Sequence, residues 1–190
     1  CPDFLPFGQQ SIDIHASLRE LLLNDPGVLN VWIGRIDFVQ GQELTDLFAG
    51  RYDIEAMMQR CKQVAGELNL PFGDRTRTYN SRRAQELGKW AEGQGAGDAF
   101  HMEIYRAYFV DGLNIAKPDI LAQITESVGL DPDKALKVID KRSYAAHVDD
   151  DWQRASELGV TAVPTSIYRQ QALVGFQAYA SYRQLIAETR

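Results

Sequence analysis

Two short segments at opposite ends of the chain carry residue types that suit thiol chemistry. Cys1 and Pro2 open the sequence, and Val163 and Pro164 end an apolar loop before a predicted strand. A cysteine thiolate is a nucleophile, and an X-Pro bond takes the cis form at a cost of only about 0.5–1 kcal/mol. A cis bond at Pro164 would present the backbone groups of Val163 to a neighbour. If that neighbour is Cys1, the segments form a thiol site beside a dock for an extended peptide. The alternative is an ordinary trans proline in a loop.

The surroundings of Cys1 decide how reactive its thiol is. A working thiol needs its pKa lowered from about 8.5, and a helix N-terminus favours the anion. A helix is predicted to start near Gln9, but Pro6 delays it and weakens that effect. No lysine, arginine or histidine occurs in the first fourteen residues. A lipid-anchored cysteine is a second interpretation of this end, although the apolar residues 4–7 do not resemble a flexible tether.

The composition excludes several classes of function. A formal net charge of -6 argues against nucleic acid and anionic membranes as partners. No apolar stretch approaches the roughly 18 residues that cross a bilayer. Two cysteines are too few for a disulfide-stapled scaffold or a cysteine metal cluster. With 190 residues and 45% hydrophobic content, the chain suits one sizeable domain or a small domain with an insertion.

The elements that would position these segments follow an α/β order. The pattern predicts a helix over 9–24, a strand over 28–33, helices throughout 42–158, strands over 165–168 and 172–174, and a helix over 180–188. Within the helical block, Asn80 and Asp131 are predicted to cap helices, and Gly159 is predicted to end the last one.

Several other residues invite a functional interpretation that we weigh against a structural one. Cys61 falls on the apolar stripe of a predicted helix and is expected to be a buried, inert thiol; the alternative is a resolving partner for Cys1. His101 and His147 are expected on helix faces, without companion ligands at metal spacing. The aromatic side chains are core residues at helical spacing, or else they line an apolar ligand groove; they are Tyr105, Tyr108, Phe109 and Trp152.

Four segments together resemble the DsbA family of thioredoxin-like proteins, with the FrnE-like branch as the most similar one. They are Cys1-Pro2, similar to the start of the family's Cys-Pro-x-Cys motif, 101–115, 155–165 and 174–177. The resemblance implies an α/β fold, with a large all-α insertion in a thioredoxin-like fold. It places the discontinuous thioredoxin-like domain at 1–41 and 159–190, and the inserted helical domain at 42–158. It also implies Cys1 as the catalytic residue, Pro2 and Phe4 as its neighbours, and Val163 and Pro164 as substrate-binding residues.

Two departures from the family pattern matter. Phe4 stands where the family has its second cysteine, so Cys1 has no resolving thiol in this motif, and Gly8 comes one residue late. The family also has a central strand leading into the active-site cysteine, whereas nothing precedes Cys1 here. We expect that strand to belong to preceding chain that the sequence lacks, because a gap inside the sheet would leave two rows of backbone groups unpaired.

The leading hypothesis is a DsbA-like thiol-disulfide oxidoreductase, or a monothiol relative that forms mixed disulfides. A glutathione-dependent isomerase or transferase of the 2-hydroxychromene-2-carboxylate isomerase or kappa class is the second, and a non-catalytic thioredoxin-like binding module is the third. We expect no cofactor, with glutathione as a candidate substrate, and protein thiols, disulfides or glutathione as partners. Nucleic acid and membrane are not expected, and a homodimer stays open. The expected compartment is the cytoplasm, with an extracytoplasmic location also open because the N-terminal segment is absent.

Overall fold

The computed structural model describes residues 28–31, 41–47, 53–175 and 177–187. The chain divides into two compact units, each considered by itself below. The first, the sheet unit, joins Cys1–Ile33 with Gln153–Arg190, and the second, the helical unit, is Gly34–Trp152. The helix predicted over 9–24 lies outside the described residues, as does the predicted strand ahead of Cys1.

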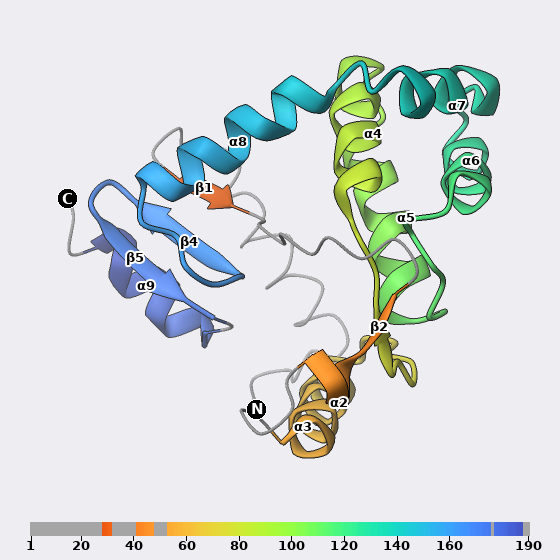
Figure 1. Ribbon diagram of the computed structural model, residues 1–190. Coiled ribbons are helices and arrows are strands. Elements are labelled where there is room, and N and C mark those ends of the chain that lie inside the picture. The colour runs from red at the N-terminus through yellow and green to blue at the C-terminus, as the bar shows by residue number, and fades with distance from the viewer. Residues whose placement is uncertain (1–27, 32–40, 48–52, 176, 188–190) are drawn as a thin grey trace, which may run out of the picture. The chain divides into compact units, whose positions relative to one another are not determined.

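Three short strands and a helix make up the described part of the sheet unit (Figure 1). They are β1 (Val28–Val31), β4 (Thr165–Tyr168), β5 (Gln171–Val174) and α9 (Tyr179–Ala187). The strand order is β1-β4-β5 and both pairs are antiparallel, with Val31 opposite Thr165 and Thr165 opposite Val174. All four residues of β4 are buried, as expected for a strand with a partner on each side. The predicted strands and the final helix are therefore confirmed within one or two residues.

Helices dominate the helical unit. They are α2 (Leu44–Leu47), α3 (Ile54–Glu67), α4 (Arg82–Gly93), α5 (Gly97–Phe109), α6 (Pro118–Ser127), α7 (Pro132–Lys141) and α8 (Ala145–Glu157), the last of which runs on into the sheet unit. Their core gathers large apolar side chains from α4 to α7, among them Leu87, Phe100, Leu121 and Ile139. In the described residues the closest helix pairs are α4 with α5 and α6 with α7.

The helix ends follow local sequence signals. The Asp131 side chain accepts hydrogen bonds from the N–H groups of Asp133 and Lys134 at the start of α7, where Pro132 takes the first helical position. The Asn80 side chain likewise accepts from the N–H of Arg82 at 2.8 Å, just ahead of α4. The predicted cap at Asp131 is thus confirmed, whereas the N-cap residue of α4 is Ser81, one position after Asn80, and its side chain makes no capping hydrogen bond.

Two predictions for the helical block are wrong. Residues 42–158 are not helical throughout, because β2 (Gln42–Glu43) pairs antiparallel with β3 (Arg77–Thr78). Strands of two residues are too short to produce a detectable period. Cys61 is not buried but exposed, because α3 presents its apolar stripe to few neighbours: of its residues only Ala65 is buried, and Met57 is 40% exposed.

In the described residues, none of the helices combines the length and the apolar character needed to cross a bilayer. The same part of the chain contains no group of three or more His, Cys, Asp or Glu side chains arranged to hold a metal ion.

Candidate functional site

The Pro164 turn, residues 160–164, connects the end of α8 to β4. α8 stops because Gly159 adopts a φ of +71°, a left-handed conformation that suits glycine. The N–H of Val160 then donates to the carbonyl of Ala155 at 3.0 Å, which closes the helix end. The predicted role of Gly159 is therefore confirmed, and this helix end fixes where the turn begins.

The other side of the turn is held by two hydrogen bonds. The hydroxyl of Thr165, a buried residue, donates to the carbonyl of Ala162 at 2.6 Å. The N–H of Gly175, at the end of β5, donates to the carbonyl of Pro164 at 2.7 Å. The peptide bond between Val163 and Pro164 is cis. The turn is therefore anchored to both strands of the β4–β5 hairpin.

Val163 is the open position of the turn. Its residue is 42% exposed, and neither its N–H nor its carbonyl hydrogen-bonds to another described residue. A donor and an acceptor without partners in the described part of the chain, on an exposed turn, suit pairing with an extended peptide backbone. Residues 158–168 contain no acid, lysine, arginine, histidine or cysteine side chain. The turn can therefore dock a ligand, but a thiol, or a side chain that titrates near neutral pH, must come from elsewhere.

The predicted site residues divide accordingly. Val163 and Pro164 lie in the turn just described, whereas Cys1, Pro2 and Phe4 lie outside the described residues. Sequence reasoning did not single out Thr165 or Gly175 as anchors of the turn. The signals available were a hydroxyl directly after the proline and a glycine at the end of a predicted strand, and neither is specific by itself.

The aromatic residues considered as groove lining belong to the helical unit instead. Tyr108 packs against the core, and its hydroxyl pairs with Thr78 Oγ1 at 2.9 Å. Burial raises the pKa of Tyr105 to about 12. The indole N–H of Trp152 donates to the side-chain oxygen of Gln85 at 2.9 Å. These contacts favour the structural interpretation of the aromatic residues.

The family of the chain follows from comparison with known proteins. The model of the DSBA-like thioredoxin domain matches residues 33–187. The chain therefore belongs to the DSBA-like thioredoxin domain family, with the thioredoxin-like α/β fold and helical insertion that the sequence predicts. No curated protein matches the chain in sequence.

Solved structures with a similar fold carry different activities. A protein described as a probable DsbA oxidoreductase from Streptomyces coelicolor is 23% identical, with a TM-score of 0.70 over 78% of this chain and 68% of that one. A 2-hydroxychromene-2-carboxylate isomerase is 18% identical, with a TM-score of 0.63 over 97% and 89%. The cytosolic disulfide reductase DsbM from Pseudomonas aeruginosa, solved with GSH, is 20% identical, with a TM-score of 0.52 over 73% and 77%. At these identities the comparison establishes the fold.

Proposed function

We propose that the protein is a DsbA-like thiol-disulfide oxidoreductase, acting as a monothiol enzyme through Cys1 and docking its substrate at the Pro164 turn. The observation that carries the proposal is the exposed Val163, whose N–H and carbonyl make no hydrogen bond to another described residue, in a chain of the DSBA-like family. An extended peptide or the backbone of glutathione would add to this turn as a strand. Cys1-Pro2 supplies the nucleophile, as the family motif implies.

The chemistry needs two thiol-disulfide exchanges, because Phe4 replaces the second cysteine. In the first, the Cys1 thiolate attacks a disulfide R–S–S–R′, forming a Cys1–S–S–R mixed disulfide and releasing R′–S⁻, which takes a proton from water. In the second, a glutathione thiolate attacks the mixed disulfide, frees the Cys1 thiolate and leaves as R–S–S–glutathione. Glutathione is the reductant of this cycle, and the substrate disulfide is the oxidant.

The first test is the intact mass of the protein after incubation with oxidised glutathione. We expect one glutathione adduct on the wild type, absent from Cys1→Ser. Cys61 is exposed and offers a second reactive position, so Cys61→Ser and the double variant are needed as controls. Retention of the adduct in Cys61→Ser and its loss in Cys1→Ser would support the proposal. An adduct carried by Cys61 alone, or none, would contradict it.

A glutathione-dependent isomerase or transferase is the second candidate function. It is favoured by the isomerase structure, which aligns with 97% of this chain. The two functions separate by their dependence on the thiol, since isomerisation does not require a mixed disulfide at Cys1. Turnover of a conjugation or isomerisation substrate that survives Cys1→Ser would favour the second candidate. Peptide binding without either activity would select the non-catalytic binding module.

The remaining proposals follow from the chemistry. The proposed partners are protein thiols, protein disulfides and glutathione, and no bound cofactor is proposed. The proposed compartment is the cytoplasm, because it holds the reduced glutathione that the second exchange needs. The similar DsbM structure is described as cytosolic and contains GSH. Membership of the FrnE-like branch and a homodimeric assembly stay predictions.

A further inference from the structure

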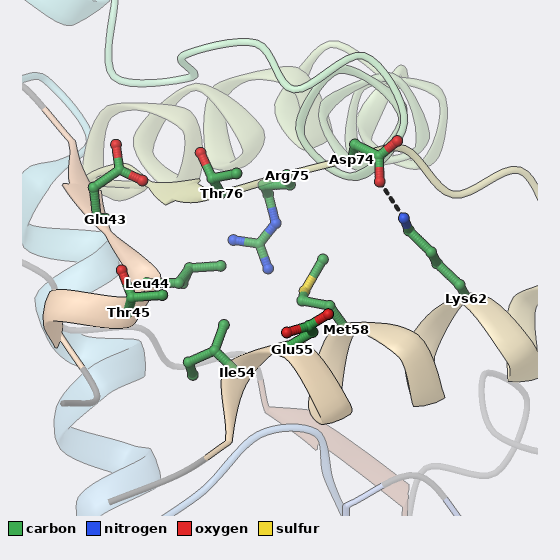
Figure 2. A pocket seen from close by; sticks show the side chains of 10 residues that line it. All are labelled: Glu43, Leu44, Thr45, Ile54, Glu55, Met58, Lys62, Asp74, Arg75 and Thr76. Carbon is green, nitrogen blue, oxygen red and sulfur yellow. Dashed lines mark hydrogen bonds and ion pairs between the residues drawn. The ribbon is translucent and has the colours of Figure 1, made fainter. Parts of the chain in front are cut away.

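A pocket in the helical unit is lined by residues that the proposed function does not use. Its volume is about 320 Å³, at the small end of the range for ligand sites. Side chains of β2, of α2, of α3 between Ile54 and Lys62, and of residues 74–76 line it (Figure 2). Leu44, Ile54 and Met58 make the apolar part of the lining. The main chain holds these walls together, since the N–H of Leu44 donates to the carbonyl of Thr76 at 2.8 Å.

Arg75 extends its guanidinium into the space between α2 and α3, as Figure 2 shows. Its Nη1 donates to the Tyr108 hydroxyl at 2.6 Å and to the Arg77 carbonyl at 3.3 Å. Its Cζ lies 4.5 Å from the ring centroid of Tyr108 and 5.3 Å from that of Phe109. The guanidinium is thus fixed on one side by hydrogen bonds and by two aromatic rings.

The other side of the same guanidinium has no partner. Nε of Arg75 is buried without a hydrogen bond, and Nη2 makes none to the described residues. Nε–H and Nη2–H lie on one edge of the planar group and point in nearly the same direction. This edge matches the two oxygens of a carboxylate, which it can bind through two parallel hydrogen bonds. A buried donor left unpaired is costly, so a ligand that satisfies it gains affinity.

The remaining charges of the pocket restrict the ligand. Asp74 pairs with Lys62, and Glu43 pairs with Arg77 at 3.1 Å, so these carboxylates are already neutralised. Glu55 also lines the pocket and is exposed, without a partner among the described residues. Among the described lining residues, Arg75 is thus the cation without a carboxylate partner, and the negative charge of Glu55 disfavours a dianion more than a monoanion.

We propose that this pocket binds a small organic monocarboxylate with an apolar body. The carboxylate pairs with Nε and Nη2 of Arg75, and the apolar body packs against Leu44, Ile54 and Met58. The site is independent of the thiol chemistry proposed for Cys1, and it does not use the Pro164 turn.

The test measures binding of 4-methylpentanoate to the full chain by calorimetry and by the NMR signal of the Arg75 Nε–H. We expect a saturable shift of that signal and binding at least about tenfold weaker in Arg75→Lys, because lysine keeps the charge but lacks the paired donors. Arg60→Gln is the matched control, since Arg60 is exposed on α3, one of the elements that line the pocket, and contacts Gln63 rather than the pocket. It should bind like the wild type.

A second variant covers the case in which Arg75→Lys fails to fold. Met58→Glu places a carboxylate in the pocket while leaving the contacts of Arg75 with Tyr108 intact, and it should also weaken binding by about tenfold or more. Inorganic phosphate should bind more weakly than the carboxylate. Equal binding by wild type and Met58→Glu, tighter binding of phosphate, or no change in the Nε–H signal would overturn the proposal.

Discussion

Glu86 is a charged side chain with no solvent exposure, held between two arginines. Its Oε1 accepts from Arg82 Nε at 2.8 Å and from Arg142 Nη2 at 2.6 Å, and its Oε2 accepts from Arg142 Nε at 2.9 Å. Burial opposes the ionised form, but the hydrogen bonds and charges of Arg142 and Arg82 outweigh it and lower the pKa of Glu86. The carboxylate therefore ties α4 to the end of α7.

Glu86→Gln should lower the free energy of unfolding by about 2–4 kcal/mol at pH 7, because Arg142 loses its charged partner and Arg82 keeps only its ion pair with Asp149. The folded pKa is below the unfolded one, so this stabilisation is present above the unfolded pKa and is lost as the pH falls through the folded pKa. Denaturant titrations at pH 7 and pH 3 should show that the free energies of unfolding of the wild type and Glu86→Gln are closer to each other at pH 3 than at pH 7. Glu126→Gln, at an exposed position of α6, should leave stability unchanged.

Tyr105 gives the opposite dependence at high pH. Its folded pKa is about 12, raised by burial above the ordinary value of 10.0, so the folded state disfavours the phenolate. The stability that Tyr105 contributes is fully present below pH 10 and is lost as the pH rises through its folded pKa. The free energy of unfolding, measured from pH 9 to pH 11.5, should fall less steeply with pH in Tyr105→Phe than in the wild type. Equal slopes would show that the phenol is not protected.

Residue-scale prediction from sequence succeeded where a local rule applied and failed where the environment decided. Asp131 and Gly159 were predicted correctly because capping depends on neighbouring backbone groups. Cys61 was predicted wrongly because a helical stripe shows which residues share a face, not whether anything covers that face. Arg75 carried no sequence signal, since its unpaired edge depends on Tyr108, 33 residues away.

Among the connecting elements, the segment after α3 packs against the end of α5 at a glycine. The N–H of Gly73 donates to the carbonyl of Phe109 at 2.9 Å, and a Cβ at Gly73 would overlap the carbonyl of Val110. Gly66, inside α3, has open space around its Cα. The two glycines therefore have different roles, the first required by close packing and the second not.

Alanine at each position should separate these roles. Gly73→Ala should destabilise the protein by about 1–3 kcal/mol or more, because backbone must move to admit the methyl group. Gly66→Ala should stabilise it by about 0.5–1 kcal/mol, because alanine favours the helix. Chemical denaturation of both variants checks the prediction. A stabilising Gly73→Ala would show that this contact is looser than the structure indicates.

Elements long enough to show a period were predicted well, and the shortest were not. The helices α3 to α8 lie within the block predicted to be helical, because each presents capping residues or an apolar stripe over several turns. The pair of β2 and β3 was missed because its register joins residues far apart in the sequence, Gln42 with Thr78 and Glu43 with Arg77. Short strands form when the chain around them brings them together, and no local pattern records this.

At the scale of the whole chain, the described core of the helical unit lies within one stretch of sequence. Among the described residues, its buried cluster runs from Ala84 to Ile139, all within the helical unit. A fragment of residues 41–157 should therefore fold alone, with a helical circular dichroism spectrum and cooperative thermal unfolding. A fragment that is unfolded, or that melts without cooperativity, would contradict this expectation.

The family and the fold class could be predicted because the order of elements and the segment before Pro164 can both be recognised in the sequence. The site was predictable only in part. Val163 and Pro164 could be named from their loop, whereas their anchors Thr165 and Gly175 depend on the pairing of β4 with β5.

The exposure of Cys61 has a practical consequence. Cys61 follows Met58 by three positions on α3, so both lie on one side of the helix, and Lys62 of the pocket is its direct neighbour. In a Cys1→Ser background, a maleimide fluorophore would attach at this single thiol. A change in the emission of this fluorophore would then report the binding of a carboxylate beside Arg75, so binding could be followed by fluorescence.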